Sequence, residues 1–119
     1  MTDSAPAPIV DNPTPWVAKQ IEEYLETDGA RPVFRHNSPL LLLTVKGRTS
    51  GQWRRTALIY GRDGDRLIIV ASLGGAPEHP VWYRNLVENP RVWLQVGAQT
   101  FWATARTATD ADRYFSWRT

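Results

Sequence analysis

The six residues from Leu40 to Val45 constrain the fold of this chain more than any other stretch. They read Leu-Leu-Leu-Leu-Thr-Val and follow directly on Pro39. An extended chain turns successive side chains to opposite faces, so this run is apolar on both faces. We therefore expect a central β-strand that is buried on both sides, with the rest of the chain arranged around it.

Composition limits the number of domains, the metal sites and the partners that this chain can have. The chain has 119 residues, which corresponds to one domain, and its 42% hydrophobic content is ordinary for a globular protein. The absence of cysteine excludes disulfides and zinc-thiolate sites, and His36 and His79 have no carboxylates at ligand spacing, so we expect no metal. The net charge of +2 is too small to indicate a nucleic-acid partner, whereas six tryptophans are enough to line a site or an interface.

The N-terminal region predicts a lead-in followed by a helix. Residues 1–13 are rich in Pro, Ala, Asp and Asn and are expected to be flexible, which leaves residues 14–119 as a single domain. Thr14 and Pro15 suit the start of a helix that ends near Gly29. No apolar run reaches about 18 residues and no signal peptide is visible, so we expect a cytoplasmic protein.

The rest of the chain predicts hairpins. Strands at 56–61 and 66–72 flank Asp63-Gly64, a turn signal for an antiparallel hairpin. Residues 80–90 are bracketed by prolines and predict a short helix, 92–96 and 100–106 a second hairpin, and 110–117 a final helix with Thr109 as its N-cap. This pattern predicts a mainly β (α+β) fold, a small antiparallel barrel or strongly curled sheet with short helices.

The connection from Lys46 to Arg55 is the first candidate site. It contains two glycines, two hydroxyl side chains and several cations. Exposed amides, hydroxyls and guanidinium groups are donors that bind phosphate, but a solvated hairpin tip has a similar composition. The glycine spacing fits neither a nucleoside-triphosphate loop nor a dinucleotide fingerprint. The stretch alone leaves an anion site and a plain turn equally open.

Two further segments carry candidate chemistry. Residues 70–75, Val-Ala-Ser-Leu-Gly-Gly, are mostly small at the point where a buried strand ends, which lets a flat ligand come close. Residues 79–85, His-Pro-Val-Trp-Tyr-Arg-Asn, place an aromatic pair, an arginine and an amide at a helix start, where backbone N–H groups favour anions. An ordinary strand-to-helix connection and a packing role for Trp82 are the alternatives.

Together, three segments resemble a known family. Gly47-Arg48-Thr49-Ser50-Gly51, the stretch 70–86 and Asn89-Pro90-Arg91-Val92 look like the deazaflavin-dependent nitroreductase family of actinobacteria, over a region from about Trp16 to about Asp112. The resemblance implies a split β-barrel that binds coenzyme F420, an 8-hydroxy-5-deazaflavin with a phosphate and an oligoglutamate tail. It also implies a reductase that transfers a hydride from the reduced coenzyme to a quinone-like or nitroaromatic acceptor.

The same resemblance assigns roles to individual residues. Ser72 is expected to donate a hydrogen bond at the reacting end, and Tyr60 or water to deliver a proton. Lys46 and Arg55 are expected to meet the tail carboxylates. The resemblance places the phosphate at Arg48, Thr49 and Ser50 with Gln52 and Arg54 beside them, the ring along Thr56, Ala57, Leu58 and Ile59 and against Val70, Ala71, Ser72 and Leu73, and the rest of the pocket at Val81, Trp82 and Asn85.

Two alternatives stay open, one because an anion pocket beside a flat ring also suits a flavin and the other because of a departure from the family. Relatives usually continue through a tyrosine-rich helix and a last strand that tend to close the substrate pocket, and both are missing after Thr119. The alternatives are a split-barrel oxidoreductase that binds flavin mononucleotide (FMN) and a non-catalytic deazaflavin-binding protein. The expected partner is a small-molecule acceptor and not nucleic acid, while a homodimer and a peripheral membrane contact stay open.

Overall fold

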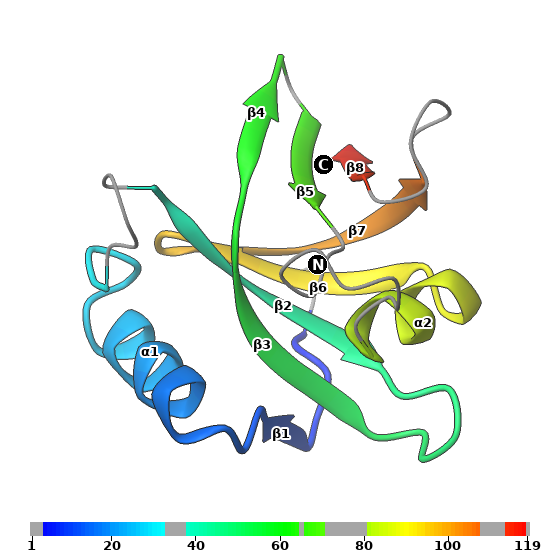
Figure 1. The fold of residues 1–119 in the computed structure, drawn as a ribbon, viewed down its shortest axis with the longest axis horizontal. Coiled ribbons are helices and arrows are strands. Elements are labelled where there is room, and N and C mark those ends of the chain that lie inside the picture. Colours follow the sequence, from blue (N-terminus) through cyan, green and yellow to red (C-terminus); the bar gives the residue numbers. More distant parts are fainter. Residues whose placement is uncertain (1–3, 33–37, 65, 71–80, 108–113, 119) are drawn as a thin grey trace.

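The residues that the structure describes form one eight-stranded sheet with two helices beside it (Figure 1). The computed structural model describes residues 4–32, 38–64, 66–70, 81–107 and 114–118. Along the sheet the strand order is β1-β3-β2-β6-β7-β8-β5-β4. The elements are β1 (Ile9–Asp11), α1 (Pro15–Glu26), β2 (Leu40–Lys46), β3 (Trp53–Ile59), β4 (Gly61–Asp63), β5 (Arg66–Val70), α2 (Val81–Glu88), β6 (Arg91–Val96), β7 (Gln99–Thr107) and β8 (Tyr114–Arg118).

Strand β2 is the buried central strand that its sequence predicts. Every residue from Leu40 to Val45 is buried, and β2 pairs antiparallel with both β3 and β6. Its side chains divide the core in two. Leu41, Leu43 and Val45 pack with apolar residues of β5, β6, β7 and α2, whereas Leu40 and Leu42 pack with the buried face of α1. The strand therefore holds both helices to the sheet.

The run formed by β3 and β4 makes the sheet a split barrel. β3 pairs with β2 at one end of the strand order, and β4 pairs with β5 at the other end. Only Tyr60 separates β3 from β4, so one chain segment supplies the last strand at one end of the order, β4, and the strand next to β1 at the other end, β3 (Figure 1). The predicted hairpin of 56–61 with 66–72 is therefore only partly correct. Gly61–Asp63 pair with β5, but the residues before Tyr60 pair with β2.

Both ends of the chain differ from the prediction. Residues 1–13 were expected to be flexible, but Ile9–Asp11 form strand β1. This strand runs parallel to β3, so the sheet is mixed and not purely antiparallel. The predicted final helix is wrong for Tyr114–Arg118, which form β8 between β5 and β7. A strand there satisfies the backbone groups of two neighbouring strands, and its aromatic residues favour extended structure. Thr109 and residues 110–113 lie outside the described residues.

Helix α1 begins at Pro15, as predicted, but its cap differs. The Thr14 side chain makes no capping bond, and the backbone N–H of Thr14 instead donates to Asn12 Oδ1 at 3.0 Å. The helix ends at Glu26, before the predicted Gly29. No helix of the described part of the chain is long and apolar enough to cross a membrane.

Tyr24 attaches α1 to the turn between β6 and β7. Its hydroxyl accepts a hydrogen bond from the backbone N–H of Gly97 at 2.7 Å and lies 3.3 Å from the carbonyl oxygen of Gln95, to which it donates. Burial raises the pKa of Tyr24, and the Gly97 hydrogen bond partly offsets this. Gly29 approaches the same turn so closely that a Cβ there would lie 2.6 Å from Gly97 Cα. The position of α1 is thus fixed by both packing and hydrogen bonds.

Three of the six tryptophans form an aromatic cluster. The ring centroids of Trp53 and Trp93 lie 5.4 Å and 5.2 Å from that of Trp102, both in edge-to-face geometry. The guanidinium carbon of Arg91 lies 4.9 Å from the centroid of the Trp102 ring. These rings stabilise the sheet. The prediction that tryptophans line a site therefore depends on Trp16, Trp82 and Trp117.

Candidate functional site

The loop between β2 and β3 is a tight turn that is held from within. Gly47 N–H donates to Gln52 O at 2.7 Å, and Gly51 N–H donates to Gly47 O at 3.0 Å. Gln52 N–H donates to the Ser50 hydroxyl at 3.2 Å. Gly51 has a φ of 72°, which strongly favours glycine, and a Cβ at Gly47 would lie 2.6 Å from Ser50 Oγ, so a larger residue there would displace that hydroxyl.

Asn85 of α2 holds this loop against the helix. Its side chain is 3% exposed, and its Oδ1 accepts from the Arg48 backbone N–H at 3.1 Å and from Arg48 Nη1 at 2.8 Å. Just after the end of α2, Asn89 Nδ2 donates to Lys46 O at 3.4 Å. Asn85 therefore positions Arg48, and one donor of the Arg48 guanidinium is already used inside the protein.

The two neighbouring arginines of β3 have different partners. Arg55 forms a two-pronged ion pair with Asp11 of β1, with Nε–Oδ1 and Nη2–Oδ2 distances of 2.5 Å and 3.1 Å. Arg54 is exposed, and its Nη2 donates a long hydrogen bond of 3.4 Å to Gln52 Oε1. The charge of Arg55 is thus balanced within the protein, whereas most donors of Arg54 face solvent.

A cavity of about 540 Å³ opens beside these arginines, between β1, β3 and the starts of α1 and α2. We call it the Arg54 cavity. One end is polar, and the remainder is mostly apolar. It is lined by Val10, Asp11, Asn12, Pro13, Thr14, Trp16, Val17, Val45, Arg54, Arg55, Thr56, Ala57, Leu58, Val81, Trp82 and Asn85.

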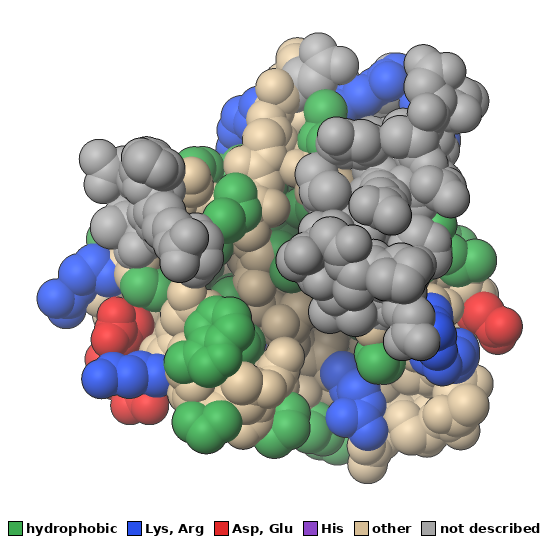
Figure 2. Space-filling model, in the orientation of Figure 1, with side chains coloured by type: hydrophobic (Ala, Val, Ile, Leu, Met, Phe, Trp, Pro, Cys, Tyr) green, Lys and Arg blue, Asp and Glu red, His purple; other side chains and the backbone are tan. Residues whose placement is uncertain are grey.

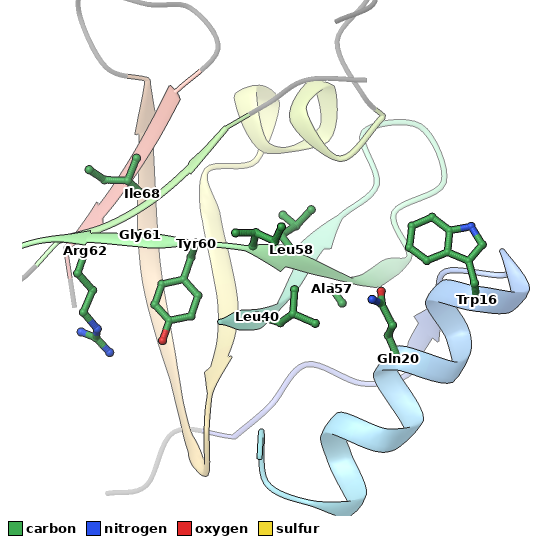
Figure 3. A pocket seen from close by; sticks show the side chains of 10 residues that line it. Trp16, Gln20, Leu40, Ala57, Leu58, Tyr60, Gly61, Arg62 and Ile68 are labelled. Carbon is green, nitrogen blue, oxygen red and sulfur yellow. The ribbon is translucent and has the colours of Figure 1, made fainter. Parts of the chain in front are cut away.

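A second cavity of about 600 Å³ adjoins the first (Figure 3). We call it the Tyr60 cavity. Both cavities share Trp16, Ala57 and Leu58 in their lining, so the two lie side by side. Figure 2 shows hydrophobic side chains gathered on this face of the molecule beside α1. The Tyr60 cavity is lined by Trp16, Gln20, Leu40, Ala57, Leu58, Ile59, Tyr60, Gly61, Arg62 and Ile68.

The edge of β3 beside the shared wall has no strand partner among the described residues. β1 covers β3 only as far as Arg55, whose carbonyl oxygen accepts from Asn12 N–H at 2.8 Å. Backbone groups of a strand point alternately to its two sides. The N–H and C=O of Ala57 and the N–H of Ile59 therefore point the same way as those of Arg55, toward the uncovered edge. This edge offers hydrogen bonds to the rim of a planar ligand.

Part of the predicted site comes together in these cavities. Ser72, with Ala71 and Leu73, lies outside the described residues, and for Val70 only the backbone in β5 is described. The exposed loop residues Arg48, Thr49, Ser50 and Gln52 line neither cavity. The Arg54 cavity contains Arg54, Arg55, Thr56, Ala57, Leu58, Val81, Trp82 and Asn85, and the Tyr60 cavity contains Ala57, Leu58, Ile59 and Tyr60.

Sequence reasoning missed the contributions of β1, α1 and β4. Trp16 is 63% exposed and belongs to both cavities, and Gln20 and Arg62 line the Tyr60 cavity. Trp16 lies outside the apolar face of α1 that Val17, Ile21 and Tyr24 form. A large aromatic residue there does not serve the core, which could have indicated a binding residue. Asp11 had a weaker signal, because it directly follows two β-branched residues, Ile9 and Val10, which favour a strand. Among the described residues no group of three potential metal ligands is present.

The described residues thus form a split-barrel-like sheet with two adjoining cavities, one of which is lined by Arg54 and Arg55. A family model described as F420H(2)-dependent quinone reductase matches residues 16–119. The chain belongs to this family. The resemblance to F420-dependent enzymes read from the three motifs is therefore confirmed, as is the mainly β split-barrel fold class.

Individual relatives agree with this assignment. The chain is 47% identical over 74 residues to an F420H(2)-dependent quinone reductase of Mycobacterium tuberculosis H37Rv, a match that covers 62% of this chain and 50% of the relative. A second protein of that strain with the same family name is 38% identical over 84 residues, 71% of either chain. The chain spans about half the length of the relatives it matches at 47% identity.

Two solved structures share the fold. One is an F420-H2 dependent reductase (FDR-A) with 28% identity and a TM-score of 0.58, covering 75% of this chain and 100% of that one. The other is described as a domain-swapped dimer, with 39% identity and a TM-score of 0.54, covering 80% of this chain and 72% of that one.

Proposed function

We propose that the protein binds coenzyme F420 in the Arg54 cavity and reduces a quinone-class acceptor with the reduced coenzyme as the hydride donor. One observation carries the proposal. A cavity with an exposed arginine, Arg54, and an edge of β3 that no described strand covers lies beside a second cavity. A hydride transfer needs donor and acceptor in contact, and the lining residues that both cavities share, Trp16, Ala57 and Leu58, support placing the two ligands next to each other.

The polar end suits the phosphate and the acidic tail. Arg54 presents guanidinium donors to the cavity, and the Gly47–Gln52 loop lies next to it, with Gln52 bonded to Arg54. Charge-assisted bonds from arginine to phosphate are among the strongest available to a protein. We assign Arg54 the main contact, and Asn85 holds Arg48 in place beside it. Contacts from Thr49 and Ser50 stay predictions.

The apolar part suits the deazaflavin ring. Ala57, Leu58, Val81 and Trp82 give small, aliphatic and aromatic walls, which is the usual lining of a site for a flat ligand. The uncovered N–H and C=O of Ala57 can bond the rim of the ring. When bound, the coenzyme supplies the hydride, and these residues orient it and exclude water.

Two groups remain as proton donors. The Tyr60 side chain lines the cavity next to the proposed ring site, so we propose that its hydroxyl or a water molecule protonates the reduced acceptor. Ser72 lies outside the described residues, and its role at the acceptor stays a prediction. Nitroaromatic acceptors and a cytoplasmic location with peripheral membrane contact likewise stay predictions.

A homodimer is a further part of the proposal. A solved structure with 39% identity to this chain is described as a domain-swapped dimer. We propose that this chain also forms a homodimer. Light scattering of the purified protein measures its mass directly, and a monomer at micromolar concentration would contradict this part alone.

The test of the main proposal is titration with oxidised coenzyme F420, followed by its fluorescence and by the protein's tryptophan emission, with FMN as the competing ligand. We expect saturable binding of F420 that a tenfold excess of FMN does not displace. Reduction of a quinone by F420H2 is then measured with the same protein. Binding of FMN alone would support the FMN alternative, and F420 binding without quinone turnover would support the non-catalytic alternative.

A further inference from the structure

The Tyr60 cavity carries chemistry that the proposed coenzyme site does not use. Its walls are mainly apolar, with polar groups from Gln20 on α1, Tyr60 at the bend and Arg62 on β4. In Figure 3 the side chains of Tyr60 and Arg62 project to the same side of the β3–β4 run. The guanidinium carbon of Arg62 lies 5.7 Å from the centroid of the Tyr60 ring. A cation is therefore held beside an aromatic ring at the cavity wall.

The charges of the two cavities differ in a way that selects ligands. Asp11 balances Arg55 in the Arg54 cavity, whereas no carboxylate lines the Tyr60 cavity, whose residues all belong to the described part of the chain. Among the described residues, the salt bridge found is that of Arg55 with Asp11, so Arg62 has a ring and no described acid as its partner. The Tyr60 cavity thus carries one positive charge at one side of an apolar space.

We propose that the Tyr60 cavity is the acceptor site and that Arg62 gives it a preference for quinones with an anionic ring substituent. This rests on the proposed function, because it needs the coenzyme in the Arg54 cavity. The apolar walls receive the quinone ring, the Arg62 guanidinium binds the anionic substituent, and the Gln20 amide is placed to donate to a quinone oxygen. Trp16 lines both cavities and so lies beside both ligands.

The reaction balances without a further reactant. The quinone gains a hydride and one proton, which together are two electrons and two protons, and becomes the hydroquinone. F420H2 loses the same number of electrons and protons and becomes F420. A hydride alone would convert the quinone to an anion, so a nearby cation stabilises the charge that develops on the quinone oxygen. Arg62 is the charged residue that lines this cavity.

The experiment compares two acceptors of similar shape. 2-Hydroxy-1,4-naphthoquinone is ionised at neutral pH, and 2-methoxy-1,4-naphthoquinone is neutral. Their dissociation constants are measured by quenching of tryptophan fluorescence, with oxidised F420 bound so that no turnover occurs. We expect the parent protein to bind the anionic quinone more tightly, and Arg62→Gln to reduce that preference about three- to fivefold, the range for a partly exposed charge pair.

Three variants separate the charge from other effects. Arg62→Lys should keep most of the preference, because it keeps the charge. Arg91→Gln is the matched control, since Arg91 also lies over an aromatic ring but lines neither cavity, and it should leave the preference unchanged. If Arg62→Gln does not fold, the salt dependence of the parent's preference decides instead, because screening should reduce it.

The outcomes distinguish this inference from the proposed function. A parent protein that binds F420 but shows no preference between the two quinones, or a preference that Arg62→Gln leaves intact, overturns the inference and leaves the proposed function standing. A protein that fails to bind F420 overturns the proposed function itself. Loss of the preference in Arg62→Gln with unchanged F420 affinity supports both.

Discussion

The Arg54 cavity and the Tyr60 cavity share a wall, yet they are built from different kinds of segment. The charged groups of the Arg54 cavity lie on neighbouring strands, and one of its two arginines is already balanced by Asp11. The polar groups of the Tyr60 cavity come from α1 and from the β3–β4 bend, and its one charge is unbalanced among the residues that line it. The comparison contrasts a cavity whose charged groups lie on adjacent strands with one whose polar groups come together only because α1 packs beside the β3–β4 run.

The largest expected effect is at Arg54. Arg54→Gln should weaken F420 binding by about 1.5 to 3 kcal/mol, the range for a hydrogen bond to a charged group. Fluorescence titration measures the change. Arg106→Gln, an exposed arginine of β7 that lines neither cavity, is the control and should bind F420 like the parent. Equal affinities of Arg54→Gln and the parent would place the anion elsewhere.

A smaller effect is expected at Asn85. Asn85→Ala removes the acceptor of two hydrogen bonds from Arg48 and should lower the free energy of unfolding by about 1 to 2 kcal/mol, with a parallel loss of F420 affinity. Urea unfolding and the same titration give the two values. Asn89→Ala, which removes one long bond to Lys46 at 3.4 Å, should change both much less. If Asn85→Ala and Asn89→Ala change stability and F420 affinity equally, the two Asn85–Arg48 hydrogen bonds contribute no more than the Asn89–Lys46 bond.

Trp16 tests whether the two cavities act together. Trp16→Ala should weaken both F420 and quinone binding, each by about 0.5 to 1 kcal/mol, because the side chain belongs to both cavities but is more than half exposed. The control is Val87→Ala, which removes an exposed apolar side chain of α2 outside both cavities. A loss confined to one ligand would mean that the wall is not shared in solution.

The smallest effect, and one of opposite sign, is expected at Asp11. Asp11→Asn removes the partner of Arg55 and a negative charge from the Arg54 cavity. F420 affinity should therefore rise by about 0.2 to 1 kcal/mol at low salt, the size of a partly exposed charge interaction. Titration at two salt concentrations measures it, and a decrease in affinity would show that the ion pair is needed to position β3.

The two cavities also differ in how far sequence predicts them. The residues of β3 and α2 that the resemblance assigns to the coenzyme, Arg54 to Leu58 with Val81, Trp82 and Asn85, line one cavity, and their coenzyme contacts stay predictions. The ion pair of Arg55 with Asp11 could not be expected from the sequence, because it depends on β1, a short strand in a proline-rich segment. A partner 44 residues away in the chain leaves no local pattern.

The fold was predicted in class but not in strand pairing. The burial of β2 follows from its composition. The β3–β4 run pairs with β2 before Tyr60 and with β5 after it, and this change of partner depends on how the whole sheet curls. β8 was mistaken for a helix for the same reason, since the neighbours that make Tyr114–Arg118 a strand are β5 and β7. Gln20 and Arg62 were missed because only the packed fold brings α1 and β4 to one cavity.

The continuous β3–β4 run also fixes a distance. Arg54, proposed to hold the coenzyme's anion, and Tyr60, at the acceptor, are six residues apart on one extended segment, which spans at most about 20 Å. An inserted or deleted residue between them would turn every later side chain to the opposite face and break one of two ladders. The spacing between anion and acceptor is therefore set by residue count along one strand, and coenzyme analogues with a longer linker between ring and phosphate should bind without reacting.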